Sequence, residues 1–173
     1  MHTPPNLDPP ESAPNGTHTP IGDRTLDELA TGCFGCGAAN PQGLHLHFTL
    51  DTTTDPEHPV ATTTVNLTEL HQGPPGHIHG GIVATLCDEA MSKLNRPLNL
   101  LAMTRNLEVD YLRPAPLHTP LTLTARHIHR DGRKLFHTVE LRLPSGDLLA
   151  RAKGLFIVID PSDLPSANSA PPA

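Results

Sequence analysis

The sequence predicts an α+β fold in which one long central helix packs against a mostly antiparallel sheet of about six strands. Residues 80–95 form the one long stretch whose apolar side chains recur at helical intervals. The other apolar stretches alternate with polar residues, as strands with one solvated face do. Two of these stretches precede the helix and four follow it. A helix and a sheet that each have one apolar face bury those faces against each other, which gives two layers.

The two strands before the helix are expected at residues 43–51 and 60–67. In the first, apolar residues from Leu44 to Leu50 alternate with polar ones, which indicates one solvated face. The second is rich in Thr and Val, residues that favour strands, and is expected to be its hairpin partner. Upstream of both, Asp23 is expected to cap a short helix.

The helix expected at residues 80–95 combines two features that suggest chemistry. Gly80 and Gly81 in its first turn let a ligand approach backbone N–H groups that have no partner within the helix. These groups and the helix dipole favour an anion or a developing negative charge. Asp88 lies at the flank of the apolar stripe, where partial desolvation would raise its pKa and suit it to act as a base. The alternative is a solvated Asp88 and glycines that only permit tight packing.

The spacing of these two features predicts a homodimer. Gly80 and Asp88 are eight residues apart in the sequence, which is about 12 Å along a helix axis. One carbonyl group cannot contact both within a single chain. If both act on it, the amide and the carboxylate come from two helices that run antiparallel across a two-fold axis.

Four strands are expected after the helix, which Pro97 ends because it lacks an amide hydrogen. Leucines alternate with threonines in the second of these strands. Asp131-Gly132 is a hairpin sequence, and residues 144–147 form another turn. The four strands are expected at residues 104–112, 119–128, 135–143 and 148–159.

Composition bounds the domain and excludes several classes of protein. The chain has 173 residues, 20 prolines and a net charge of −6, with 12 Lys and Arg against 18 Asp and Glu. This acidic balance argues against a general nucleic-acid binder, and no apolar stretch approaches membrane-spanning length. Residues 1–22 and 161–173 are Pro-rich and are expected to be disordered tails around one domain at 23–160. The three cysteines suggest no disulfide framework and the N-terminus lacks a signal-peptide pattern, so a cytoplasmic location is expected.

Residues 33–37, Cys-Phe-Gly-Cys-Gly, form a C-x-x-C-G turn that can present two thiolates to one metal ion. A four-ligand site needs a second pair of ligands; Cys87 belongs to the helix, and His45 and His47 are no more than candidates. A reduced structural turn beside the core is therefore preferred, and no metal or other cofactor is expected. A metal-binding protein built on these cysteines remains an alternative.

Five short motifs occur in order along the chain. They include the C-x-x-C-G turn, Asn-Pro-Gln-Gly-Leu at 40–44 and Gln-Gly-Pro-Pro-Gly at 72–76. The most specific part is the His-Gly-Gly at 79–81, with an acid nine residues after the histidine, followed by Tyr-Leu-Arg-Pro at 111–114. Together with the order of the elements, these motifs resemble the hotdog-fold acyl-CoA thioesterases, in particular the phenylacetyl-CoA thioesterase-like branch.

This resemblance implies a hotdog fold, in which the sheet wraps the helix, and homodimers or homotetramers paired through sheet edges. It implies hydrolysis of an acyl-CoA thioester to the free acid and CoA, at sites in the dimer interface. By position in the motifs, the oxyanion amide falls at Gly80, aided by Gly81, and the catalytic carboxylate falls at Asp88. Thr104 matches a hydroxyl that helps to orient water, and His79 opens the motif.

One position departs from the pattern of the family. Some members use an Asn six residues before the motif histidine, and here that position is Gly73. The resemblance therefore leaves the second oxyanion donor open, with Gln72 or another backbone amide as the candidates.

The phosphates of CoA require local basic groups on this acidic chain. Four residues are expected to supply them: Arg113, Arg130, Arg133 and Lys134. The last three flank the expected hairpin turn, and a solvated hairpin tip is the alternative. Asp88 would act as general base or as nucleophile. A hotdog hydratase or dehydratase that uses His79, and a non-catalytic acyl-CoA-binding module, are the alternative functions. No nucleic acid or membrane is expected as a partner.

Overall fold

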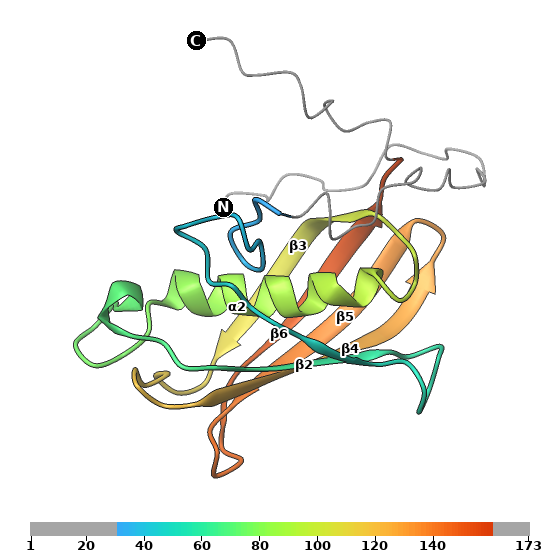
Figure 1. Cartoon of the computed structure of the whole chain (residues 1–173). Coiled ribbons are helices and arrows are strands. Elements are labelled where there is room, and N and C mark those ends of the chain that lie inside the picture. Colours follow the sequence, from blue (N-terminus) through green and yellow to red (C-terminus); the bar gives the residue numbers. More distant parts are fainter. Residues whose placement is uncertain (1–30, 161–173) are drawn as a thin grey trace, which may run out of the picture.

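One helix lies across one face of a single six-stranded sheet (Figure 1). The computed structural model describes residues 31–160, so the predicted tails and the helix expected at Asp23 lie outside the described residues. The helix is α2 (Gly80–Ser92). The strands are β1 (Thr49–Asp51), β2 (Val60–Val65), β3 (Ala102–Tyr111), β4 (Leu121–Asp131), β5 (Lys134–Arg142) and β6 (Leu148–Val158). Their order in the sheet is β1-β2-β4-β5-β6-β3, and all neighbours are antiparallel. The predicted α+β layers are confirmed.

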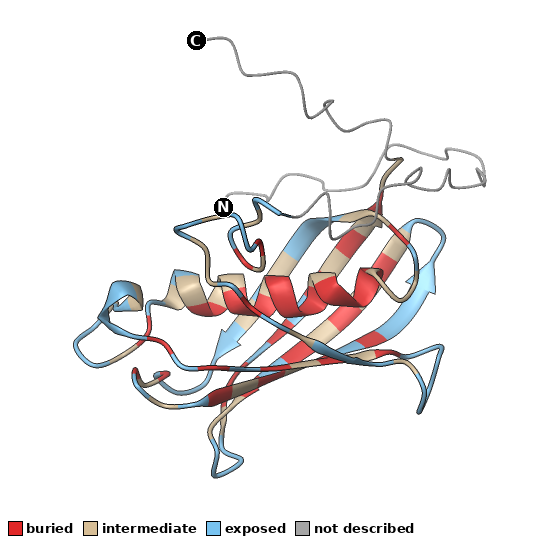
Figure 2. Cartoon of the chain, in the orientation of Figure 1, coloured by how far each residue is buried: buried red, intermediate tan, exposed pale blue. Residues whose placement is uncertain are grey.

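The core lies between α2 and the sheet face that it covers (Figure 2). Leu86, Met91 and Leu94 are fully buried from the helix side, and Leu123 and Phe156 from the sheet side. The alternation predicted for the strands therefore sets which side chains meet the helix. A short 3-10 helix, η2 (Lys93–Asn95), continues α2 to the end of the range predicted for the helix.

The strand expected at residues 43–51 is the part of the fold that was predicted wrongly, because only Thr49–Asp51 pair with β2. The backbone N–H of Leu44 donates to the carbonyl oxygen of Phe34, so the segment bonds to the cysteine turn instead of to β2. His45 also interrupts the strand, because its φ of 49° lies in the left-handed region.

β3 forms one edge of the sheet. It pairs with β6 on one side, and no other strand within residues 31–160 pairs with its outer side. Two large apolar side chains on this strand are half-exposed, Met103 at 50% and Tyr111 at 55%. Its ten residues thus offer a row of backbone groups to another strand. No helix in the described range is long and apolar enough to cross a bilayer.

Candidate active site

The first turn of α2 presents one free backbone amide. His79 is the N-cap, and its Nδ1 accepts a hydrogen bond from the N–H of Gly81 at 2.9 Å. The Gly81 amide is therefore occupied, contrary to the expectation that it assists Gly80. Within residues 31–160 no acceptor is found for the N–H of Gly80. This amide is thus available to a developing negative charge, and its role as the oxyanion donor stays a prediction.

A cavity of about 250 Å³ lies beside Gly80. Tyr111 and Arg113, at the end of β3 and just beyond it, also line this cavity. The hydroxyl of Tyr111 donates to the carbonyl oxygen of Gly80 at 3.0 Å and so ties β3 to the first turn of the helix. Sequence reasoning used Tyr111 only as part of a motif and missed this contact, because it depends on which end of β3 meets the helix.

The loop that precedes α2 explains why an Asn is absent at position 73. A Cβ atom on Gly73 would lie 2.8 Å from the Cα of His79, which is too close for any larger residue without a shift of the backbone. The N–H of His79 donates to the carbonyl oxygen of His71 at 2.9 Å and holds the loop in this position. Gln72, the other candidate donor, accepts the N–H of Gly76 with its side-chain oxygen at 3.1 Å and braces the loop.

Asp88 lies half-buried on the side of α2 that faces β3. The hydroxyl of Thr104 donates to its Oδ1 at 2.8 Å. Burial raises the pKa of Asp88, the Thr104 hydrogen bond lowers it in part, and the neighbouring charge of Glu89 raises it. The net shift is upward, in the direction expected from its position at the flank of the apolar stripe.

A β-bulge in β3 places Thr104 beside Asp88. The register with β6 shifts between Thr104 and Asn106, so Arg105 is the extra residue. Thr104 pairs with the buried Phe156, whereas Asn106 pairs with Leu155 and lines a groove on the opposite face of the sheet. Without the bulge, two residues that are two positions apart would face the same side. The bulge therefore turns the Thr104 hydroxyl toward the helix.

The predicted amide and carboxylate do not meet within one chain. Gly80 and Asp88 are separated by about 12 Å along α2, and Asp88 is not among the residues that line the cavity beside Gly80.

The four predicted CoA-binding residues also divide between the two ends of the sheet. Arg113 lines the cavity and forms an exposed ion pair with Asp147 at 2.9 Å. Arg130, Arg133 and Lys134 lie at the turn between β4 and β5, at the other end. Arg133 donates from its Nε to the carbonyl oxygen of Val158 at 2.9 Å. A single chain therefore does not gather these cations around one phosphate-bearing ligand.

Sequence reasoning missed a buried polar cluster on the other side of α2. Lys93 forms an ion pair with Glu89 at 2.7 Å, and its Nζ donates to the Sγ of Cys36 at 2.6 Å. Burial raises the pKa of Glu89, but interactions with Cys36 and Lys93 outweigh it and the net pKa is lowered. Burial and the carboxylate of Glu89 raise the pKa of Cys36 to about 11. The available signal was a Glu–Lys pair four residues apart on an otherwise apolar helix.

The fold and the placement of these groups define a hotdog domain: one long helix wrapped by an antiparallel sheet, with a free amide at its first turn. Solved structures with this fold include the PaaI protein of E. coli (TM-score 0.54, 23% identity, 57% of this chain and 75% of that one). A hypothetical thioesterase from Streptococcus pneumoniae solved with coenzyme A has a TM-score of 0.57 at 22% identity, over 66% of this chain and 90% of that one.

Residues 75–150 match the family described as Thioesterase superfamily. A solved thioesterase superfamily protein is 36% identical over 70% of this chain and 60% of that chain, with a TM-score of 0.62. The chain is therefore similar to proteins of the thioesterase superfamily over the helix and most of the sheet. It is also similar to acyl-coenzyme A thioesterase THEM4 of Bos taurus (36% identity over 91 residues) and of Rattus norvegicus (38% over 96 residues). These matches cover 52% and 53% of this chain but only 37% and 40% of those relatives, so the chain spans less than half of their length.

Proposed function

We propose that this protein is an acyl-CoA thioesterase that cleaves its substrate in a site shared by two subunits. The observation that carries the proposal is the separation of two complementary groups on one helix. The Gly80 amide is free beside a cavity, and the Asp88 carboxylate is half-buried and held by Thr104 eight residues further on. The THEM4 relatives are named acyl-coenzyme A thioesterases, and the pneumococcal structure contains coenzyme A, which supports this substrate class.

In the proposed reaction, the thioester carbonyl oxygen accepts a hydrogen bond from the Gly80 amide. The bond strengthens as the oxygen gains charge in the tetrahedral intermediate, and one such donor typically contributes about 3 kcal/mol. In one route, Asp88 of the partner subunit takes a proton from water, which attacks the carbonyl carbon. In the other route, Asp88 attacks that carbon itself and displaces the CoA thiolate to give a mixed anhydride, which water then hydrolyses to the free acid and the restored carboxylate. The Thr104 hydroxyl of that same subunit orients the carboxylate. The leaving thiolate of CoA takes up a proton.

The exposed edge of β3 supports assembly into a homodimer. Two copies of β3 that pair antiparallel would place the Tyr111 end of one strand beside the Ala102 end of the other. Gly80 lies at the Tyr111 end and Asp88 at the Thr104 end, so a two-fold axis brings the unlike groups together twice. The same axis would bring Arg113 toward the hairpin turn that carries Arg133 in the second subunit. Two such dimers could associate into a tetramer.

The choice of Asp88 and Thr104 has one further support. Two solved structures of the pneumococcal thioesterase carry alanine in place of an aspartate and in place of a threonine. Those two positions are separated by 16 residues, as Asp88 and Thr104 are.

Release of free thiol from a panel of acyl-CoAs tests the reaction. Short, medium, long and aryl acyl chains identify the preferred substrate, and an enoyl-CoA distinguishes hydrolysis from hydration. We expect thiol release from saturated acyl-CoA. Consumption of enoyl-CoA with no release of thiol from any substrate would instead indicate a hydratase, and binding without turnover would indicate a binding module.

Complementation between two inactive variants tests the shared site. Gly80→Pro removes the amide hydrogen at a helix position where proline is tolerated, and the extended backbone of His79 suits a following proline. Gly80→Ala is the matched control, since its Cβ would meet Tyr111 at an ordinary 3.7 Å and the amide is kept. Heterodimers of Gly80→Pro with Asp88→Asn contain one intact site of two. Subunits refolded or co-expressed together should therefore recover about a quarter of wild-type activity. No recovery in verified heterodimers would exclude a site built from both subunits.

A further inference from the structure

The C-x-x-C-G turn is held firmly against α2 by the chain itself. The N–H of Gly37 closes the turn on the carbonyl oxygen of Cys33 at 2.8 Å. The segment that follows the turn also bonds to it, because the N–H of Leu46 donates to the carbonyl oxygen of Gly35 at 2.9 Å. Gly37 is required sterically, since a Cβ there would lie 2.4 Å from the backbone nitrogen of Cys33. The two thiols are therefore presented together on a preformed turn.

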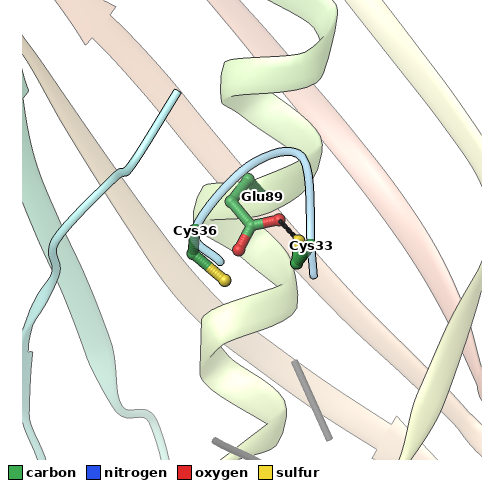
Figure 3. Close-up of side chains that lie close together, drawn as sticks. All are labelled: Cys33, Cys36 and Glu89. Atoms are coloured by element: carbon green, nitrogen blue, oxygen red, sulfur yellow. Dashed lines mark hydrogen bonds between the residues drawn. The ribbon is translucent and has the colours of Figure 1, made fainter. Parts of the chain in front are cut away.

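Glu89 enters this turn from the helix. Figure 3 shows its carboxylate between the side chains of Cys33 and Cys36. A Cβ on Gly35 would lie only 2.4 Å from Oε2 of Glu89, so the glycine makes room for the carboxylate. The Sγ of Cys33 donates to the same oxygen at 3.5 Å. The turn and the helix thus meet at three atoms that can all ligate a metal ion.

We propose that Cys33, Cys36 and Glu89 form a site for a thiophilic divalent cation of the Zn²⁺ class. Their two sulfur atoms and one carboxylate oxygen all lie within 4.8 Å of one another. Ligands of a tetrahedral zinc ion stand about 3.8 Å apart when both are thiolates, so a small contraction completes the triangle. Both cysteines are partly exposed, which gives the ion a path of entry and leaves a fourth position for water.

Lys93 lies beside this site and balances its charge. Its Nζ is 2.6 Å from the Sγ of Cys36 and 2.7 Å from Oε1 of Glu89, and its side chain is 7% exposed. With two thiols, one carboxylate and one ammonium, the metal-free cluster is neutral. A divalent cation that displaces the two thiol protons leaves it neutral again. Lys93 then donates to a thiolate and a carboxylate that ligate the metal, as outer partners of metal ligands do.

The proposed site is separate from the thioesterase chemistry. Its ligands come from the turn and from a face of α2 other than the one that meets Thr104, and its cation would join two segments that are more than 50 residues apart in sequence. A metal bound only by the folded chain stabilises that chain. A cation bound at this site would therefore link the turn to the helix and stabilise the fold, whether or not the protein hydrolyses acyl-CoA.

Titration with Co²⁺ tests the site in the reduced, untagged full chain after treatment with a chelator. Thiolate ligation gives a sulfur-to-cobalt charge-transfer band that histidines on the surface do not produce. We expect the band to saturate at one cobalt ion per chain and to disappear when Zn²⁺ is added. Cys33→Ser and Cys36→Ser should each abolish it, and Glu89→Gln should weaken binding at least tenfold. Cys87→Ala, which removes the thiol outside the cluster, should retain it.

Two results would overturn the proposal. One is a wild-type chain that shows no charge-transfer band, and the other is a band that persists in both serine variants. In the first case, a band that appears in Lys93→Met would mean that the lysine ammonium permanently holds the position of the cation. A rise of the wild-type Tm with Zn²⁺ that is absent in Cys33→Ser provides a second readout, independent of colour.

Discussion

Asp88 and Glu89 are neighbours in α2, yet their carboxylates lie in opposite electrostatic surroundings. Asp88 faces β3, half-buried, with the hydroxyl of Thr104 as its hydrogen-bond partner. Glu89 faces the cysteine turn, is buried, and has Lys93 at 2.7 Å. Burial raises the pKa of Asp88, whereas for Glu89 the lysine and thiol contacts outweigh burial and lower the pKa. A carboxylate with a buried cation is held in one place and one charge state. A carboxylate without one retains the capacity to accept a proton.

The largest expected effect comes from breaking the Glu89–Lys93 pair. Glu89→Leu leaves the ammonium of Lys93 buried without its carboxylate, and such a loss typically costs about 3–5 kcal/mol of unfolding free energy. Urea denaturation in the presence of a chelator measures it. The double variant Glu89→Leu with Lys93→Met should recover most of the loss, because no uncompensated charge remains. A single variant as stable as the wild type would show that the pair is not important for folding.

The next effect is on catalysis alone. Asp88→Asn should lower kcat roughly a hundredfold or more while the urea midpoint stays close to that of the wild type. An amide cannot accept the proton of water, but it can keep the hydrogen bond from Thr104. Asp55→Asn, in an exposed loop, is the matched control and should leave kcat unchanged. Wild-type turnover by Asp88→Asn on the best substrate would remove Asp88 from the mechanism.

A third buried titratable group, His137, differs from both carboxylates, because it is uncharged and has hydrogen-bond partners. His137 contacts Asn95 at 3.1 Å and His127 at 3.1 Å, and burial lowers its pKa from 6.5 to about 3. The folded state thus disfavours the proton that the unfolded chain accepts. The contribution of neutral His137 to the free energy of unfolding is complete above pH 6.5. It is lost as the pH falls toward 3, by about 1.4 kcal/mol per pH unit. His137→Gln should flatten this slope in urea titrations between pH 6.5 and 5, whereas the exposed His47→Gln should not.

The smallest effect should come from the partner of Asp88. Thr104→Val removes the hydroxyl that orients the carboxylate and should lower kcat about tenfold. Thr104→Ser restores the donor and should recover most of the rate. If the valine and serine variants are equally slow, the methyl group matters and the hydrogen bond does not.

The elements that follow a simple periodicity were predictable from the sequence. Alternation in β4 predicts its buried face, and the helical stripe predicts α2 nearly to its ends. Residues 43–48 alternate in the same way but bond to the cysteine turn, a partner that local pattern does not reveal. Periodicity predicts which side chains are buried more reliably than which backbone groups pair.

The candidate site was predictable only in part. Gly80 and Asp88 stand out because glycines at a helix start and an acid on an apolar helix need an explanation. The bulge at Arg105 does not stand out, because one extra residue in a strand leaves no mark in composition. Glu89 was missed for a similar reason, since its partners Cys33 and Cys36 lie 56 and 53 residues away in sequence.

The edge strand carries a further implication for how activity depends on protein concentration. Tyr111 links one end of β3 to Gly80, and Thr104 links the other end to Asp88, so both groups of the proposed reaction are attached to the surface that would receive the second subunit. In a solitary chain, neither the Gly80 amide nor the Asp88 carboxylate would then lie beside the group that complements it. Turnover per chain should fall steeply on dilution past the dissociation constant of the dimer, and added substrate that bridges the two copies should shift that threshold downward.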